Sequence, residues 1–530
     1  MSIEIRDVWL ERATYRPDEA AAAHLSLLLA HTGETTTVTT PPRFEIGVHL
    51  SWLHDQSGAW SYPVELRPGE EVALRLPLPL PTAPFRGYGV AVEVRGEAGQ
   101  ILAQRSTAID VLDNWTQAPR YGFLSDFAPD DTTGEAHVGA LARYHINVAQ
   151  FYDWMWRHYE LMPPTEDFTD ALGRSLSLRS VRAKVAACHH YGIAALGYAA
   201  VYGAEPEYIE SHPDEMVFDE NGKPYSLDEL FYIMNLAPDG PWRARMLQTM
   251  REAVRDVPFD GLHLDQYGFP KESAFDSQGR AYDMAADFAT FINEARAAIQ
   301  PQEREARVIF NAVENWPIEL VAPTDQDAVY IEVWPPYVQY RDLQQLIVAA
   351  QRLAPTKQVI LAAYMKPLGD AAAIVEAEAA TRLTSAAIWA NGGFHLLLGE
   401  QDAALYDPYY VKHALLRPEF ARVMRAYYDF VVRYMNILSD RRLTLCDSET
   451  LPARTVTIDG YHVSPNGDAD TIWTVERAMP GYRSISFINL TTSTDANWNV
   501  PTSPPVALEA LPVRLRFDDH ESALQVRRVF

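Results

Sequence analysis

Eight runs of apolar residues, alternating with stretches of helical periodicity, constrain the fold of the middle of this chain more than any other feature. Most are continuously apolar, as parallel strands buried on both faces require. Eight strands alternating with helices predict a (β/α)8, or TIM, barrel. A doubly wound open sheet is the alternative, but no GxGxxG motif follows the first strand. The predicted strands are residues 120–127, 146–154, 193–203, 260–268, 307–313, 328–334, 357–365 and 385–399.

The segments on either side of these runs have a different pattern. In residues 1–115, stretches such as FEIGVHLSWL and YGVAVEVRG alternate apolar and polar residues between Pro/Gly turns. This alternation is typical of antiparallel strands and predicts a β-sandwich. TVTIDGYHVS, DTIWTVER and YRSISFINL have the same character near the C-terminus. We therefore expect three domains: a β-sandwich over residues 1–115, the barrel over 116–435 and a smaller β-sandwich over 436–530.

Composition narrows the classes of partner. A formal net charge of -26 and a pI of about 5.0 would repel nucleic acid and anionic membranes, whereas a neutral substrate is compatible with them. No apolar run reaches the ~18 residues of a spanning helix, and the N-terminus lacks a signal-peptide pattern. A cytoplasmic protein is expected, or a secreted one if a leader has been removed. Cys188 and Cys446 form no metal-binding motif, and we expect neither metal nor cofactor.

Two acidic residues end predicted strands, where barrel enzymes place their working groups. Asp265 ends the apolar run of FDGLHLDQYG, on the fourth strand, and Glu332 lies in VYIEVWPPY, on the sixth. Strands two apart in a closed barrel can direct side chains into one central space. An Asp at a strand end is often a helix cap or an ion-pair partner, but a Glu inside an apolar strand needs a specific partner. Paired carboxylates suit glycoside hydrolysis.

The neighbours of each carboxylate predict different roles. The polar residues His263, Gln266 and Tyr267 should hold Asp265 ionised through hydrogen bonds. Aromatic packing around Glu332 should raise its pKa toward that of a general acid. A separation of about 5–5.5 Å between the carboxyl groups would indicate retention of anomeric configuration, and about 6.5–9.5 Å inversion.

Aromatic residues are the second signal. Trp154, Trp156, Tyr202, Tyr267, Trp316, Trp334 and Tyr337 gather at predicted strand ends, where they can stack on sugar rings. Ordinary core packing is the alternative interpretation. Asp, Asn and Lys side chains nearby can bond sugar hydroxyls. The candidate substrate-binding residues are Tyr152, Asp153, Trp154, Tyr202, Gln266, Tyr267, Asn311, Trp334 and Lys366.

Four motifs, FYDWMWRH, FDGLHLDQYG, FNAVENW and VYIEVWPPY, together resemble glycoside hydrolase family 66. That family contains endo-dextranases and cycloisomaltooligosaccharide glucanotransferases, which act on α-1,6-glucan. The resemblance implies an immunoglobulin-like N-terminal domain, a central barrel and a C-terminal β-sandwich. It also implies that Asp265 is the nucleophile and Glu332 the acid/base of a retaining double displacement.

The family contains two activities, and the sequence favours one. Glucanotransferases of the family carry a carbohydrate-binding module inserted late in the barrel, whereas only about 20 residues separate the seventh and eighth predicted strands here. We therefore expect an endo-hydrolase of α-1,6-glucan or isomalto-oligosaccharides that is a monomer or weak oligomer. The alternatives are a glucanotransferase and a barrel that binds glycans without cutting them.

Overall fold

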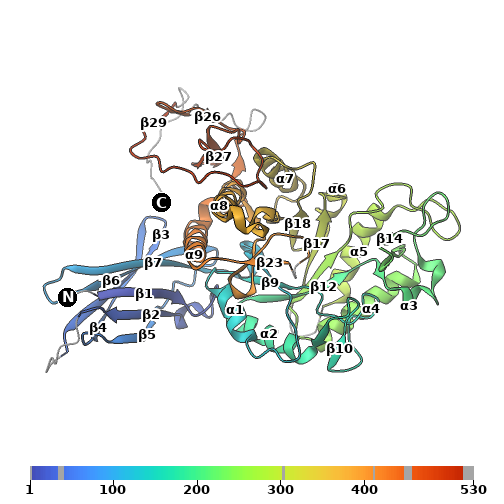
Figure 1. Cartoon of the computed structure of the whole chain (residues 1–530), viewed down its shortest axis with the longest axis horizontal. Coiled ribbons are helices and arrows are strands. Elements are labelled where there is room, and N and C mark those ends of the chain that lie inside the picture. Colours follow the sequence, from blue (N-terminus) through green and yellow to red (C-terminus); the bar gives the residue numbers. More distant parts are fainter. Residues whose placement is uncertain (1–2, 34–40, 301–304, 410–411, 447–455, 517–530) are drawn as a thin grey trace.

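The computed structural model describes residues 3–33, 41–300, 305–409, 412–446 and 456–516, and its largest element is a curled sheet (Figure 1). Each of the eight predicted runs contains a strand of one parallel row, and neighbours in the row pair in parallel. In spatial order the strands are β8 (Tyr121–Leu124), β9 (Val148–Phe151), β12 (Ala194–Ala200), β16 (Gly261–Asp265), β17 (Arg307–Val313), β18 (Ala328–Glu332), β19 (Val359–Ala362) and β20 (Gly393–His395).

The eighth predicted strand is too long. Its first half, up to Ala390, is the end of helix α8 (Ile374–Ala390), and strand β20 begins only at Gly393. The stretch SAAIWA is apolar but rich in alanine, which favours a helix. Gly392, at φ 80°, supplies the left-handed residue that commonly follows a helix end.

One short segment, residues 393–399, connects the last strand of the parallel row to the first. β20 pairs with β19, and β21 (Leu398–Gly399), four residues further on, pairs with β8. The sheet then continues through the antiparallel strands β22 (Ala403–Leu405) and β23 (His413–Leu415). Large side chains fill the inside of the curl, among them Tyr121, Leu196, Ile309, Tyr330 and Phe394.

Helices alternate with the parallel strands and bury their apolar faces against the sheet. Local sequence explains where several of them begin. Ser177 caps α2, Asp283 caps α5, and Gln339 forms a capping box with Asp342 at the start of α7. The helices are α1 (Gly134–Ala142), α2 (Leu178–His190), α4 (Pro241–Asp256), α5 (Met284–Ala298), α6 (Ile318–Val321), α7 (Tyr340–Leu353) and α8.

The N-terminal segment forms two antiparallel sheets around a core of its own (Figure 1, blue). Leu27, Ile46 and Val92 belong to this core. Helix α9 (Pro418–Arg433) lies between these sheets and the curled sheet, and Asp429 accepts a hydrogen bond from Thr107. One sheet has the order β1 (Ile3–Leu10), β2 (His24–His31), β5 (Glu71–Pro77); the other has the order β4 (Asp55–Glu65), β3 (Arg43–Trp52), β6 (Arg86–Arg95), β7 (Ile101–Val111).

The C-terminal segment also forms small sheets, which lie beside α7 and α8 (Figure 1, red). The Trp498 indole donates to the carbonyl of Tyr337, which ties this segment to the loop after β18. The predicted domain boundaries at 115 and 435 stay predictions. The strands here are β24 (Thr444–Leu445), β25 (Val456–Ile458), β26 (Val463–Ser464), β27 (Ile472–Met479), β28 (Tyr482–Asn489) and β29 (Val513–Leu515).

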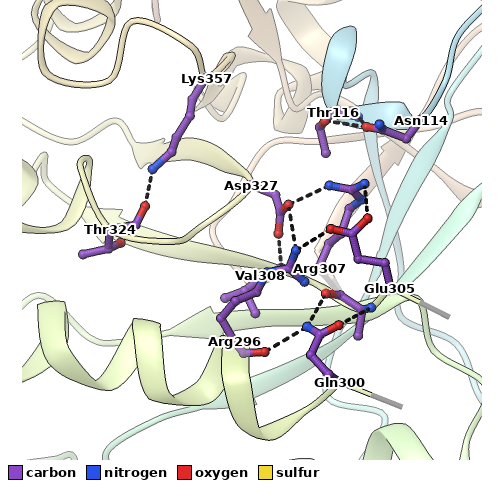
Figure 2. A network of polar contacts seen from close by, with 11 residues as sticks. Asn114, Thr116, Arg296, Gln300, Glu305, Arg307, Val308, Thr324, Asp327 and Lys357 are labelled. Atoms are coloured by element: carbon purple, nitrogen blue, oxygen red, sulfur yellow. Dashed lines mark hydrogen bonds and ion pairs between the residues drawn. The ribbon is translucent and has the colours of Figure 1, made fainter. Parts of the chain in front are cut away.

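A polar network ties together the first residues of β17 and β18 (Figure 2). Asp327 accepts hydrogen bonds from the Val308 amide at 2.7 Å and from Arg307 at 2.8 Å, and lies 3.5 Å from Arg296. Burial raises the pKa of Asp327, whereas these donors lower it. The network fixes the ends of the strands opposite to Glu332.

Three further observations concern the described residues only. None of their helices is long and apolar enough to cross a membrane. They contain no group of three or more His, Cys, Asp or Glu side chains placed to hold a metal ion. Cys188 and Cys446 are both buried free thiols.

We predict that Asp110→Ala strongly destabilises the chain. Asp110 on β7 is fully buried and accepts hydrogen bonds at 2.7 and 3.2 Å from Arg120, which is 2% exposed. Losing one partner leaves a buried charge uncompensated, at a cost of about 3–5 kcal/mol. Thermal unfolding of the full chain measures the loss. In the control, Glu65→Ala breaks the exposed Arg43–Glu65 pair and should cost less than about 1 kcal/mol. Equal losses in the two variants would contradict this prediction.

Candidate active site

The two predicted carboxylates lie at the same edge of the curled sheet. Asp265 is the last residue of β16 and Glu332 the last residue of β18, and β17 separates these strands. Asn311 lies on β17, between them. Because the strands are parallel, all three side chains come from neighbouring carboxyl-terminal strand ends, where barrel active sites lie.

One amide group joins the two carboxylates. The Asn311 Nδ2 donates to Asp265 Oδ1 at 2.7 Å and to Glu332 Oε2 at 3.1 Å. The two accepting oxygens therefore lie within about 6 Å of each other, on either side of one amide.

A phenol contacts each carboxylate on its other oxygen. Tyr198 on β12 donates to Asp265 Oδ2 at 2.7 Å, and Tyr364, two residues beyond β19, donates to Glu332 Oε1 at 2.8 Å. Burial and the nearby Asp265 charge raise the pKa of Tyr198 well above its ordinary value, so this phenol stays a donor. The predicted partners of Asp265 were wrong for the side chains of His263 and Tyr267, which bond Tyr121 and His158 instead.

Burial dominates the electrostatics of the pair. It raises the pKa of Glu332 to about 7, with a further increase from the Asp265 charge, against the lowering effect of the Tyr364 and Asn311 bonds. Burial also raises the pKa of Asp265, whereas hydrogen bonds from Tyr198, Asn311 and the Gln266 backbone lower it. A pKa near 7 is suited to a group that must both donate and accept a proton.

The pair opens into a cavity of about 600 Å³, within the usual size range of small-molecule sites. Much of its wall comes from hairpins inserted after β9 and β12. The first is β10 (Asp167–Thr169) with β11 (Ser175–Ser177), and the second is β14 (Ser226–Leu227) with β15 (Phe231–Ile233). Aromatic side chains in the wall are Tyr152, Trp156, Tyr198, Phe231, Tyr267, Trp334, Tyr364 and Tyr409.

The cavity wall is acidic. Among the described residues it contains one arginine, Arg157, and six carboxylates, so an anionic substrate would be repelled. A neutral ligand with many hydroxyl groups finds acceptors and aromatic faces instead. The carboxylates are Asp153, Asp170, Asp228, Asp265, Glu314 and Glu332.

Asp153 is a third buried carboxylate beside the pair. Its backbone has φ 50°, a left-handed conformation that side chains other than glycine seldom adopt. Arg174 lies 3.3 Å from its carboxylate, and Arg174 is itself held by Asp170. Burial raises the pKa of Asp153 to about 7, with Arg174 acting in the opposite direction. Backbone strain held in place by such contacts is common at functional sites.

A second buried pair supports the wall at Tyr267. The His158 backbone amide donates to Glu205 at 2.8 Å, and the His158 ring lies 3.4 Å from the Tyr267 hydroxyl. Burial lowers the pKa of His158 to about 3 and raises that of Glu205 to about 7. The imidazole is therefore neutral and can orient the phenol of Tyr267.

Six of the nine candidate substrate-binding residues line the cavity, and three do not. Trp154 is fully buried and donates to the Tyr198 carbonyl. Tyr202 is fully buried and supports the loop after β16, since its hydroxyl accepts from the Tyr267 amide. Lys366 is exposed and lies outside the wall. Those in the wall are Tyr152, Asp153, Gln266, Tyr267, Asn311 and Trp334.

Sequence reasoning missed Tyr198, Tyr364 and the hairpin residues of the wall. Tyr198 lies in the middle of the apolar run AALGYAA, which reads as core. Tyr364 lies near the end of the predicted strand 357–365, where the sequence gives no sign of its partner. Hairpins such as the one carrying Phe231 are short strands within loops, and only the tertiary structure brings them over the sheet edge.

We predict that Glu332→Gln stabilises the chain at alkaline pH. The pKa of Glu332 is about 7 in the folded chain and 4.5 when unperturbed. The folded state therefore loses stability relative to the unfolded state as pH rises through this range, because the buried carboxyl resists ionisation. Glutamine cannot ionise, so above pH 7 the variant should be more stable by roughly 3 kcal/mol, and the difference should vanish below the unfolded pKa. Thermal unfolding at acidic and alkaline pH measures this. Glu319→Gln, at an exposed position on α6, is the control; a pH-independent difference for Glu332→Gln would contradict the prediction.

Three known proteins are similar to this chain over most of its length. Two cycloisomaltooligosaccharide glucanotransferases of Niallia circulans are 22% and 23% identical over 98% and 83% of this chain, and a dextranase of Streptococcus salivarius is 24% identical over 81%. The matches span 67%, 60% and 60% of the length of these relatives.

The fold has a close structural counterpart. A Paenibacillus cycloisomaltooligosaccharide glucanotransferase, solved in complex with cycloisomaltoheptaose, superposes with a TM-score of 0.89 at 21% identity. The superposition covers 98% of this chain and 93% of that structure. The family model of glycosyl hydrolase family 66 matches residues 11–528. The predicted resemblance is thereby confirmed, and the chain belongs to glycosyl hydrolase family 66.

Proposed function

We propose that this chain is a retaining endo-hydrolase of α-1,6-glucosidic linkages in dextran or isomalto-oligosaccharides. One observation carries the proposal: Asp265 and Glu332 share the Asn311 amide within a cavity that is open to ligand. Two carboxyl groups this close, on opposite sides of a bound sugar linkage, form the apparatus of glycoside hydrolysis.

The chemistry assigns one role to each carboxyl group. Asp265 attacks the anomeric carbon and forms a covalent glucosyl-enzyme, while protonated Glu332 gives its proton to the leaving oxygen. Glu332 then removes a proton from water, which attacks the same carbon and releases Asp265. The raised pKa of Glu332 supports this assignment, because a general acid must be protonated near neutral pH.

The short separation supports retention. Inverting enzymes leave room for a water molecule between the sugar and the base, whereas one amide holds an oxygen of Asp265 and an oxygen of Glu332 within about 6 Å of each other. A nucleophile that attacks the anomeric carbon directly needs a spacing of only about 5–5.5 Å between the carboxyl groups.

The cavity and the relatives support a neutral glucan as substrate. The acidic wall disfavours phosphorylated or carboxylated sugars, and its aromatic side chains offer faces for sugar rings. A family member from Streptococcus salivarius is a dextranase, and the relatives from Niallia circulans are cycloisomaltooligosaccharide glucanotransferases. Both names concern chains of isomaltose-type glucose units.

Transglycosylation is the second candidate, because two of the relatives and the structural counterpart are glucanotransferases. The region between β19 and β20 contains only short 3-10 turns and α8. It does not separate the two activities, because the structural counterpart, a glucanotransferase, is matched over 93% of its own length.

We further propose that the curled sheet is a closed (β/α)8 barrel flanked by an immunoglobulin-like β-sandwich and a C-terminal β-sandwich. The support for closure is that residues 393–399 contain both β20, the last strand of the parallel row, and β21, which pairs with β8, the first strand. The support for separate flanking domains is the independent core of the N-terminal sheets.

We predict that Asp265→Asn and Glu332→Gln each lower kcat on dextran by about 10³-fold or more, because each removes a group that acts in the transition state. Reducing-sugar release measures the rate, and circular dichroism confirms the fold. Asp260→Asn is the matched control, since Asp260 lies before β16 at its opposite end and accepts from the Ala195 amide. Full activity in Asp265→Asn would refute the assignment. A parent chain that binds dextran without releasing products would be a non-catalytic glycan binder.

We predict linear products that appear first as the α anomer. Hydrolysis with retention gives this result, whereas inversion gives the β anomer first. Proton NMR of early products follows the anomers, and mass spectrometry separates linear chains from cyclic ones, which lack one water. Cyclic or lengthened oligosaccharides as the main products would instead assign the chain as a glucanotransferase.

A further inference from the structure

Five neighbouring strands of the curled sheet contribute one side chain each to a continuous chain of hydrogen bonds. The spatial order of these strands is β12, β16, β17, β18, β19. Hydrogen-bond donors and acceptors alternate from each strand to the next, and the last donor lies just after β19. Two phenols stand at the ends, two carboxylates come next, and one amide stands in the centre. The members are Tyr198, Asp265, Asn311, Glu332 and Tyr364.

The bonding pattern leaves little freedom at the centre. The Asn311 Nδ2 has two hydrogens, and each has one carboxylate oxygen as its acceptor. The reverse orientation of the amide would place Oδ1 against both carboxylates. In the observed orientation Oδ1 is buried without a hydrogen-bond partner, which is a cost that ordinary core positions avoid. The position is therefore organised for the two carboxylates.

The phenols at the two ends of this series of hydrogen bonds are placed just as specifically. Tyr198 bonds only the oxygen of Asp265 that Asn311 leaves open, and Tyr364 bonds the corresponding oxygen of Glu332. The Tyr198 ring also packs edge-on against Tyr152, with ring centroids 4.9 Å apart, and the Tyr364 ring packs against Trp334 at 6.4 Å. Each phenol is thus held by the cavity wall while it holds one carboxylate.

We propose that Tyr198, Asn311 and Tyr364 are positioning residues of this enzyme. Tyr198 orients Asp265 alone, Tyr364 orients Glu332 alone, and Asn311 fixes the position of the two carboxyl groups relative to each other. This inference rests on the proposed function, since it assigns the devices that hold the proposed nucleophile and acid/base.

Because each phenol bonds a different carboxylate, its removal should change a different part of the pH dependence of kcat/KM. A donor stabilises the ionised form of the carboxylate that it bonds, so its removal raises the pKa of that group. Nucleophilic attack needs ionised Asp265 and sets the acidic limb of kcat/KM; protonated Glu332 sets the alkaline limb. The groups that face Asp265 are Asn311, Asp153, Tyr198, Tyr202, Tyr267 and Glu332. Those that face Glu332 are Asp265, Asn311, Trp334 and Tyr364.

The test is a set of pH profiles of kcat/KM on dextran for full-length variants. Tyr198→Phe should move the acidic limb to higher pH by about one pH unit and leave the alkaline limb in place. Tyr364→Phe should move the alkaline limb alone, also to higher pH. Asn311→Ala should move both limbs upward, and Asn311→Asp is the isosteric variant used if Asn311→Ala fails to fold.

A matched control separates this role from general stability. Tyr144→Phe removes a phenol–carboxylate bond of the same kind, from Tyr144 to Asp402, outside the cavity wall. It should lower the unfolding temperature without moving either limb. Unmoved limbs in all three site variants, or both phenol variants moving the same limb, would overturn the proposal.

A second readout keeps the inference separate from the proposed function. Infrared difference spectra follow protonation of carboxyl groups without substrate, with Asp265→Asn and Glu332→Gln assigning the bands. If the parent chain does not cleave dextran, the proposed function fails, while selective changes of these two titrations still support the positioning roles. If dextran is cleaved and the titrations do not respond selectively, only the positioning proposal fails.

Discussion

The bonds from the Asn311 amide to Asp265 and Glu332 are the interaction on which the rest of the site depends. Two carboxylates within about 6 Å of each other repel when both are ionised, and burial makes each charge costly. A donor shared between them reduces both penalties at once. It can exist only where three neighbouring strands end at one edge, so the curled parallel sheet is a condition for the chemistry.

Burial raises the pKa of both carboxyl groups, and their neighbours then act on each one differently. Both carboxyl groups are desolvated, yet the pKa of Glu332 rises to about 7, partly because Asp265 is charged beside it. The donors to Asp265 favour its ionised form. In the proposed mechanism the same two residues therefore act as nucleophile and acid because of their neighbours, although their side chains have similar intrinsic acidity.

The outer elements provide the walls rather than the reacting groups. Hairpins after β9 and β12 enclose the cavity, and they add side chains such as Phe231 and Asp170. Arg174 holds Asp153 in its left-handed conformation beside the pair. The network at Asp327 lies at the opposite strand ends, outside the cavity wall. Loops at one edge can thus vary the ligand while the strands keep the chemistry constant.

The amino-acid sequence by itself determined the strands, their parallel character and the two acidic strand ends, because buried parallel strands are continuously apolar and any carboxylate among them stands out. It also identified six residues of the cavity wall. It misplaced Trp154, Tyr202 and Lys366, since strand-end position does not reveal side-chain direction. Only the tertiary structure decided which groups bond the carboxylates: Tyr198 and Tyr364 come from strands far away in sequence, and sheet register alone brings them to Asp265 and Glu332.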